Sequence, residues 1–61
     1  MELIKRIITE APKYLFKHGQ LWLEHEPEQV EPIQNLAEEN FAVHIHNDQY
    51  QVPRFTQLML Q

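Results

Sequence analysis

The sequence predicts a small α/β domain in which the elements follow the order helix, strand, helix, strand, strand. Two patterns support this. Apolar residues recur every three or four positions in residues 2–17 and 29–38, which is typical of amphipathic helices. Short apolar or alternating runs at 20–25, 41–46 and 54–61 are bounded by glycine, proline and asparagine, which is typical of strands. We expect a three-stranded mixed sheet in which the last strand lies in the middle and runs antiparallel.

The first helix is expected over residues 2–17. Its buried stripe consists of Leu3, Ile4, Ile7, Ile8, Ala11 and Leu15. Lys17 and His18 suit the negative end of this helix, and Gly19 suits the position just past its C-cap. Pro12 cannot donate to the carbonyl of Ile8, so we expect a kink or a division of the helix there.

The first strand is a near-continuous apolar run, which predicts a strand covered on both faces, with Trp22 as a core residue. Glu26-Pro27-Glu28 ends this strand, and the second helix is expected to begin near Gln29 and to stop at Asn40. The apolar stripe of this helix consists of Val30, Ile33, Leu36 and Ala37.

The last two strands alternate clearly between two faces. In the second strand, one face carries Phe41, Val43 and Ile45, and the other carries Ala42, His44 and His46. In the third strand, one face carries Thr56, Leu58 and Leu60, and the other carries Phe55, Gln57 and Met59. The first two strands and the helix between them can form a parallel crossover, and the third can return between them.

Composition limits the classes of function. A chain of 61 residues forms one domain at most, so we treat residues 1–61 as a single domain. A net charge of −4 with five basic residues argues against binding to nucleic acid or to an anionic membrane. No apolar run approaches the roughly 20 residues of a membrane span. With no cysteine and no signal peptide in view, we expect a soluble cytoplasmic protein.

Several polar residues invite a chemical interpretation, and each also has a simpler one. Glu24 and His25 end a predicted parallel strand, where α/β sheets place ligands, or they simply stop the strand in water. His25, His44 and His46 are potential zinc or nickel ligands, or the two later histidines are ordinary polar residues on an edge strand.

The carboxylates and the single tryptophan do not identify a catalytic or binding site either. Glu24, Glu26 and Glu28 suggest paired carboxylates, although a helix start explains two of them. Asp48 and Arg54 are expected to pair and to fix the last hairpin rather than to take part in catalysis. No serine is present, which excludes a serine nucleophile. We therefore assign no catalytic, cofactor-binding, substrate-binding or metal-binding residue.

The chain carries four short motifs in a fixed order: Leu15-Phe16-Lys17-His18-Gly19, Leu21-Trp22-Leu23-Glu24-His25, a helix opened by Gln29, and Asp48 followed by Arg54-Phe55. Taken in this order, the motifs resemble the C-terminal end of the HemK/PrmC family, the release-factor glutamine methyltransferases. The likeness extends from about Leu3 to Leu60. The chain departs from the family at the usual glycine pair, of which only Gly19 remains, and at Tyr50, where the family usually has glycine.

The resemblance implies the C-terminal part of a Rossmann-like, class I methyltransferase fold, so residues 1–61 are expected to form a single, partial domain. The intact family transfers a methyl group from S-adenosylmethionine to a glutamine side chain of class I release factors. It binds this cofactor with a glycine-rich loop and its substrate with an Asn-Pro-Pro-Tyr motif, and neither occurs in these residues. Alone, the segment is expected to be inactive and to bind no cofactor. An organellar homologue would place it in the mitochondrial matrix.

The expected partner is therefore the missing N-terminal part of the domain, which would pair with the edge of the Gln20–Glu24 strand. The alternative is a free-standing interaction module that uses the same edge to bind another chain, most simply a second copy of itself.

Overall fold

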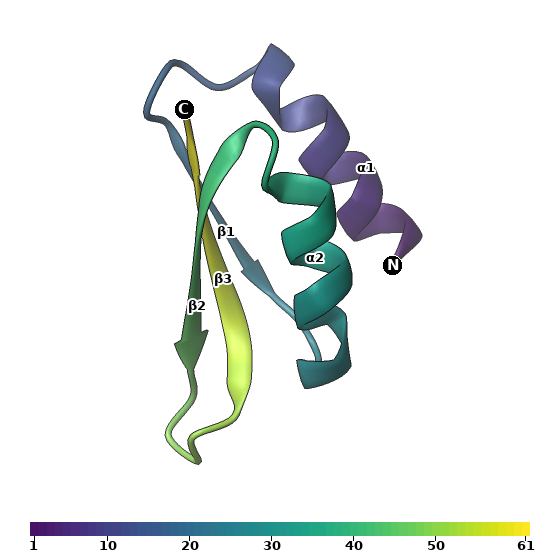
Figure 1. Ribbon diagram of the computed structural model, residues 1–61, viewed down its shortest axis with the longest axis vertical. Helices are drawn as coiled ribbons and strands as arrows, with labels where there is room; N and C mark the ends of the chain where they lie inside the picture. Colours follow the sequence, from purple (N-terminus) through teal and green to yellow (C-terminus); the bar gives the residue numbers. More distant parts are fainter.

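A three-stranded sheet covered on one face by two helices forms the whole structure, a computed structural model that describes residues 1–61 (Figure 1). In chain order the elements are α1 (Glu2–Glu10), a 3₁₀ turn (Ala11–Lys13), β1 (Gln20–Glu24), a second 3₁₀ turn (Pro27–Gln29), α2 (Val30–Ala37), β2 (Phe41–Asn47) and β3 (Pro53–Leu60). The predicted order of elements is confirmed.

The strand order is β1-β3-β2, so the last strand lies in the middle as predicted. Each outer strand pairs antiparallel with β3, and the register places Trp22 and His44 on either side of Gln57. The prediction of a mixed sheet is wrong in one respect. β1 and β2 run in the same direction but never pair, since β3 separates them, and every hydrogen-bonded pair in the sheet is antiparallel.

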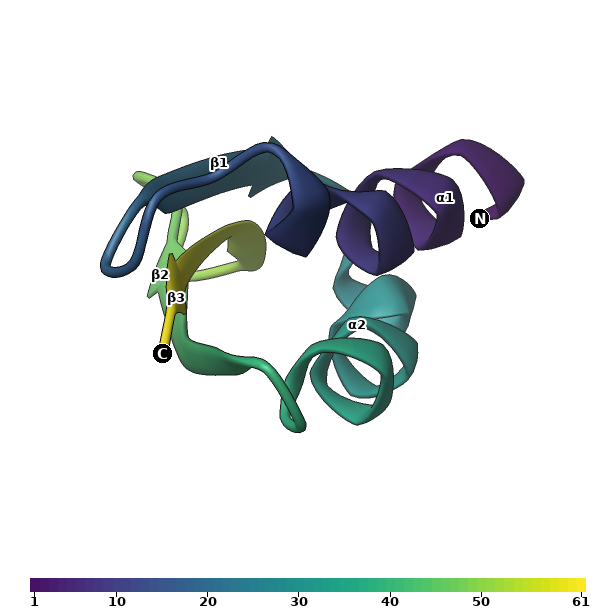
Figure 2. The same ribbon diagram turned by 90° about the horizontal axis from the view of Figure 1, so that it is seen from above.

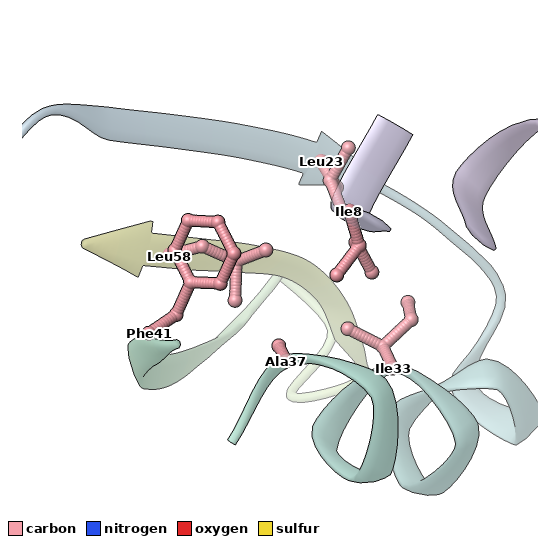
Figure 3. Packing of buried hydrophobic residues seen from close by; sticks show 6 residues of the cluster. All are labelled: Ile8, Leu23, Ile33, Ala37, Phe41 and Leu58. Atoms are coloured by element: carbon pink, nitrogen blue, oxygen red, sulfur yellow. The ribbon is translucent and has the colours of Figure 1, made fainter. Parts of the chain in front are cut away.

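The core lies between the sheet and the helices. Seen from above, α1 and α2 both lie on the same side of the strands (Figure 2). Ile8 of α1 points toward Leu23 of β1 and toward Ile33 of α2 in the close view (Figure 3). The six buried apolar residues are Ile8, Leu23, Ile33, Ala37, Phe41 and Leu58. All six belong to predicted apolar stripes or strand faces, because helical and strand periodicities each bring apolar residues to one side.

The first helix is shorter than expected. The α-helix ends at Glu10, and Pro12 lies in the 3₁₀ turn that follows, so the predicted division at this proline is confirmed. The expectation of helix up to residue 17 is wrong. Pro12 has no N–H to donate and its ring crowds the preceding turn, so the helix does not resume beyond it. Lys17 and His18 consequently lie in the loop before β1, not at a helix end.

Gly19 has a different role from the one predicted. The residue with left-handed backbone is His18, at φ 67°, and no glycine of the chain has a positive φ. A Cβ on Gly19 would lie 2.8 Å from the carbonyl oxygen of Phe16 and 3.2 Å from the Cβ of Leu15. Close packing of the backbone therefore requires glycine here, rather than a left-handed cap.

The second face of the sheet is uncovered. The side chains of Trp22 and Phe55 remain 56% and 36% exposed on this face. The predictions that β1 is covered on both faces and that Trp22 belongs to the core are therefore wrong. An apolar run does not say how many layers cover a strand, and here both helices lie on the same face.

Candidate functional site: the free edge of β1

The outer edge of β1 presents unpaired backbone groups. The amide of His25 donates to the carbonyl of Arg54 at 2.9 Å, and the carbonyl of Gly19 accepts from the amide of Leu60 at 2.8 Å. In an antiparallel ladder the bonding direction alternates from one residue to the next. The odd-numbered residues of β1 therefore face β3, and the N–H and C=O groups of Gln20, Trp22 and Glu24 point away from the sheet.

An apolar groove runs beside this edge. It has a volume of about 450 Å³, and α1, the first 3₁₀ turn and β1 all contribute to its lining. The apolar and aromatic residues that line it are Leu3, Ile7, Ala11, Tyr14, Leu15 and Leu21. Leu3 and Tyr14 are 71% and 78% exposed. At the rim, Arg6 and Glu10 form an ion pair of 2.9 Å within α1. The edge and the groove share Leu21, so they form one continuous surface, which we call the β1 surface.

The uncovered sheet face adjoins the β1 surface and carries an ordered set of side chains. The rings of Trp22 and His46 stack with centroids 5.1 Å apart. Gln57 lies between the two outer strands, where its Nε2 donates to Gln20 Oε1 at 3.0 Å and its Oε1 lies 3.1 Å from His46 Nε2. These contacts hold Trp22 against the sheet although no second layer covers it.

The two edges of the sheet differ in what adjoins them. Between His46 and Asn47 the register of β2 against β3 shifts by one residue, because Arg54 of β3 has no partner on β2, so this irregularity belongs to the central strand. β1 pairs without a register shift over its whole length and contains no proline. The only charge within β1 is that of Glu24, at the end of the strand. The β1 edge is regular over its whole length, and the apolar groove beside it makes it the better template for an additional strand.

His25 is buried, not a strand end in water. Its exposed fraction is 5%, and that of Thr56 is 0%. Nδ1 of His25 lies 2.9 Å from the carbonyl oxygen of Glu26, which only accepts, so Nδ1 carries the proton of the neutral ring. The Thr56 hydroxyl then donates to Nε2 at 2.6 Å. This pair ties the end of β1 to β3, a link that no pattern in the sequence indicated.

The three histidines considered as metal ligands do not come together. His25 is buried, while His44 and His46 are exposed on the uncovered face. Nowhere does the structure gather three histidine, aspartate or glutamate side chains that could hold a metal ion.

The carboxylates considered as a catalytic set have separate partners or none. Oε2 of Glu26 accepts from Arg54 at 3.2 Å, while Glu24 and Glu28 are exposed on either side of it. The predicted pairing of Asp48 with Arg54 is confirmed, at 3.3 Å. Together these contacts tie the β2–β3 turn to the end of β1, so they stabilise the fold.

Asp48 also shapes the turn itself. Its Oδ1 accepts from the amides of Tyr50 and Val52, at 2.7 and 3.1 Å. The left-handed residue of this turn is Gln51, at φ 64°, while Tyr50 is 75% exposed. A shallow depression is lined by this turn together with Glu24, Arg54 and Phe55.

Comparison with known proteins gives no match: no family model, no curated protein and no solved structure is similar to this chain. No helix of the structure has both the length and the apolar character needed to cross a membrane. The candidate site therefore rests on the geometry of the β1 surface.

Proposed function

We propose that this chain is the closing unit of a larger sheet, the C-terminal part of a glutamine methyltransferase domain that resembles the HemK/PrmC family. The observation that carries the proposal is the arrangement of the strands. β3 lies antiparallel between two strands of common direction, as expected for the end of a class I methyltransferase sheet.

The β1 surface gives this proposal a physical basis. A preceding strand would pair with the outward backbone groups of Gln20, Trp22 and Glu24, and an apolar element would fill the groove. Each Å² of apolar surface removed from water stabilises an assembly by about 25 cal/mol. The exposed parts of Leu3, Tyr14 and Trp22 thus favour a larger assembly over the isolated unit.

In this proposal the chain contributes the closure of the sheet and not the methyl transfer. S-adenosylmethionine supplies the methyl group in the intact family. Every buried side-chain nitrogen and oxygen of this chain already has a hydrogen-bond partner within it. The proposal places both cofactor and glutamine contacts on the preceding part of the domain, because the glycine-rich loop and the Asn-Pro-Pro-Tyr motif of the family do not occur in these residues.

The proposal is tested by complementation. A HemK/PrmC enzyme truncated before the corresponding segment is co-expressed with this chain, and the two are purified through a tag on the truncated enzyme. We expect the chain to co-purify and to restore methylation of the release-factor glutamine, measured by mass spectrometry. A soluble truncated enzyme that neither retains this chain nor regains methylation would contradict the proposal.

A matched pair of variants locates the contact. Leu3→Asp places a carboxylate in the groove at a residue that is 71% exposed, so it leaves the core intact. Gln34→Asp places the same charge on the exposed surface of α2. We expect Leu3→Asp to reduce co-purification and Gln34→Asp to leave it unchanged.

A further inference from the structure

We propose that two copies of this chain associate through their β1 strands, antiparallel about a two-fold axis, with Trp22 opposite Trp22 of the second copy. The inference depends on the geometry of the β1 surface and not on the methyltransferase assignment. A preceding strand in a longer protein would occupy the same edge.

The register follows from the sequence of the strand, Gln20-Leu21-Trp22-Leu23-Glu24, which is nearly the same in both directions. An antiparallel pairing centred on Trp22 places Gln20 opposite Glu24, and Leu21 opposite Leu23, of the second copy. The outward groups of β1 belong to residues 20, 22 and 24, which are the residues that this register pairs by hydrogen bonds. Every outward N–H and C=O group of β1 gains a partner.

The side chains match in the same register. On the uncovered face, the two Trp22 rings become cross-strand neighbours, an aromatic pairing that stabilises sheets. The amide of Gln20 comes beside the carboxylate of Glu24, to which it can donate. On the other face, Leu21 and Leu23 meet between the two grooves, and the exposed apolar side chains of Leu3 and Tyr14 approach the second copy.

The area that a stable dimer needs indicates how much of the β1 surface must take part. A standard interface takes about 800 Å² from each partner. That is about a fifth of the 4447 Å² that this chain exposes, so the edge and the groove must both take part. The resulting sheet has the order β2-β3-β1-β1-β3-β2. Two-fold pairing uses the β1 edge of both copies, so no β1 edge remains free, which favours a closed dimer over a fibre.

The test uses two substitutions of one exposed residue with opposite expected effects. Gln20→Lys places a positive charge opposite Glu24 of the second copy, and Gln20→Glu places a negative charge there. Each change occurs twice in the dimer because of the symmetry. From the strength of cross-strand pairs, we expect Gln20→Lys to lower the dimer Kd by about 2- to 30-fold and Gln20→Glu to raise it similarly.

Sedimentation over a range of concentrations measures the Kd, and circular dichroism verifies that each variant is folded. The control pair, Gln34→Lys and Gln34→Glu, makes the same charge changes on α2, away from β1, and is expected to shift the Kd little. Trp22 is the only tryptophan, so its emission should shift to the blue as the dimer forms.

Three results would overturn the inference. The first is a chain that stays monomeric up to about 1 mM. The second is a dimer whose Kd moves in the same direction with both Gln20 variants. The third is a dimer that responds as strongly to the Gln34 pair as to the Gln20 pair. Failure of the dimer leaves the complementation result unaffected, since that experiment uses a different partner for the edge.

Discussion

Thr56→Val should destabilise the fold through a single hydrogen bond. The substitution keeps the branched shape of the side chain and removes the hydroxyl that donates to His25 Nε2 at 2.6 Å. Nδ1 already donates to the carbonyl of Glu26, so the ring cannot turn its other nitrogen toward a new partner without losing that bond. Both side chains are buried, which keeps water from replacing the hydroxyl.

The expected cost follows from the unsatisfied nitrogen. A buried acceptor left without a donor costs about 1–3 kcal/mol. For a chain of 61 residues the entropy of unfolding is about 130 cal/mol/K, so each kcal/mol lowers the melting temperature by about 8 °C. A domain of this length has a total stability of about 3–9 kcal/mol, so the loss is a large share of it.

Thermal and urea unfolding, followed by circular dichroism at one fixed protein concentration, measure this loss. Thr56→Ser is the control, because it keeps the hydroxyl and removes only a methyl group. The double variant His25→Phe, Thr56→Val removes both polar partners, so it should recover part of the stability. A Thr56→Val protein as stable as the wild type, or a double variant less stable than either single one, would refute the role given to this bond.

Three further predictions concern the fold. His18→Gly should raise the melting temperature, because it removes the strain of about 1–2 kcal/mol that a side chain causes in a left-handed backbone conformation. Gly19→Ala should lower the melting temperature, because it forces a Cβ against the Phe16 carbonyl oxygen. Equal effects of the two changes on the melting temperature would contradict this account. Asp48→Ala should cost more free energy of unfolding than Arg54→Met, since Asp48 also accepts from two turn amides, while the ion pairs of the partly exposed Arg54 contribute about 1 kcal/mol or less each. Ile33→Ala should cost about 2–5 kcal/mol by leaving a cavity at a fully buried site, as urea titration would measure.

The sequence predicts much of this fold because its periodicities are clear. The alternation in β2 and β3 identifies which side chains are buried, and the structure confirms it at Phe41, Thr56 and Leu58. The strand order came from the family resemblance rather than from periodicity, and it is confirmed by the pairing. The family assignment itself stays a prediction.

The wrong predictions share one physical cause. Local sequence patterns specify neither how many layers cover a sheet nor which atoms from distant parts of the chain approach closely in the fold. Trp22 lies in an apolar run, yet its burial depends on whether a second layer covers the sheet. His25 follows that run, which suggests either a ligand position or a strand end in water, but the hydroxyl that makes its burial tolerable lies 31 residues away in sequence. Glycine is required at position 19 because a Cβ there would clash with the Phe16 carbonyl oxygen, and no sequence pattern predicts this contact.

The position of β3 also constrains the order in which the chain folds. Among the three strands of this chain, neither β1 nor β2 has a neighbour until β3 is in place, so this three-stranded sheet cannot form on a ribosome before residues 53–60 have left the exit tunnel. A short turn joins β2 and β3, so these two strands can pair early in folding. β1 pairs with residues far along the chain, such as Met59, which lies 39 residues beyond Gln20, so its pairing is expected to form more slowly. We therefore expect the β2–β3 hairpin to form first and β1 to join it last.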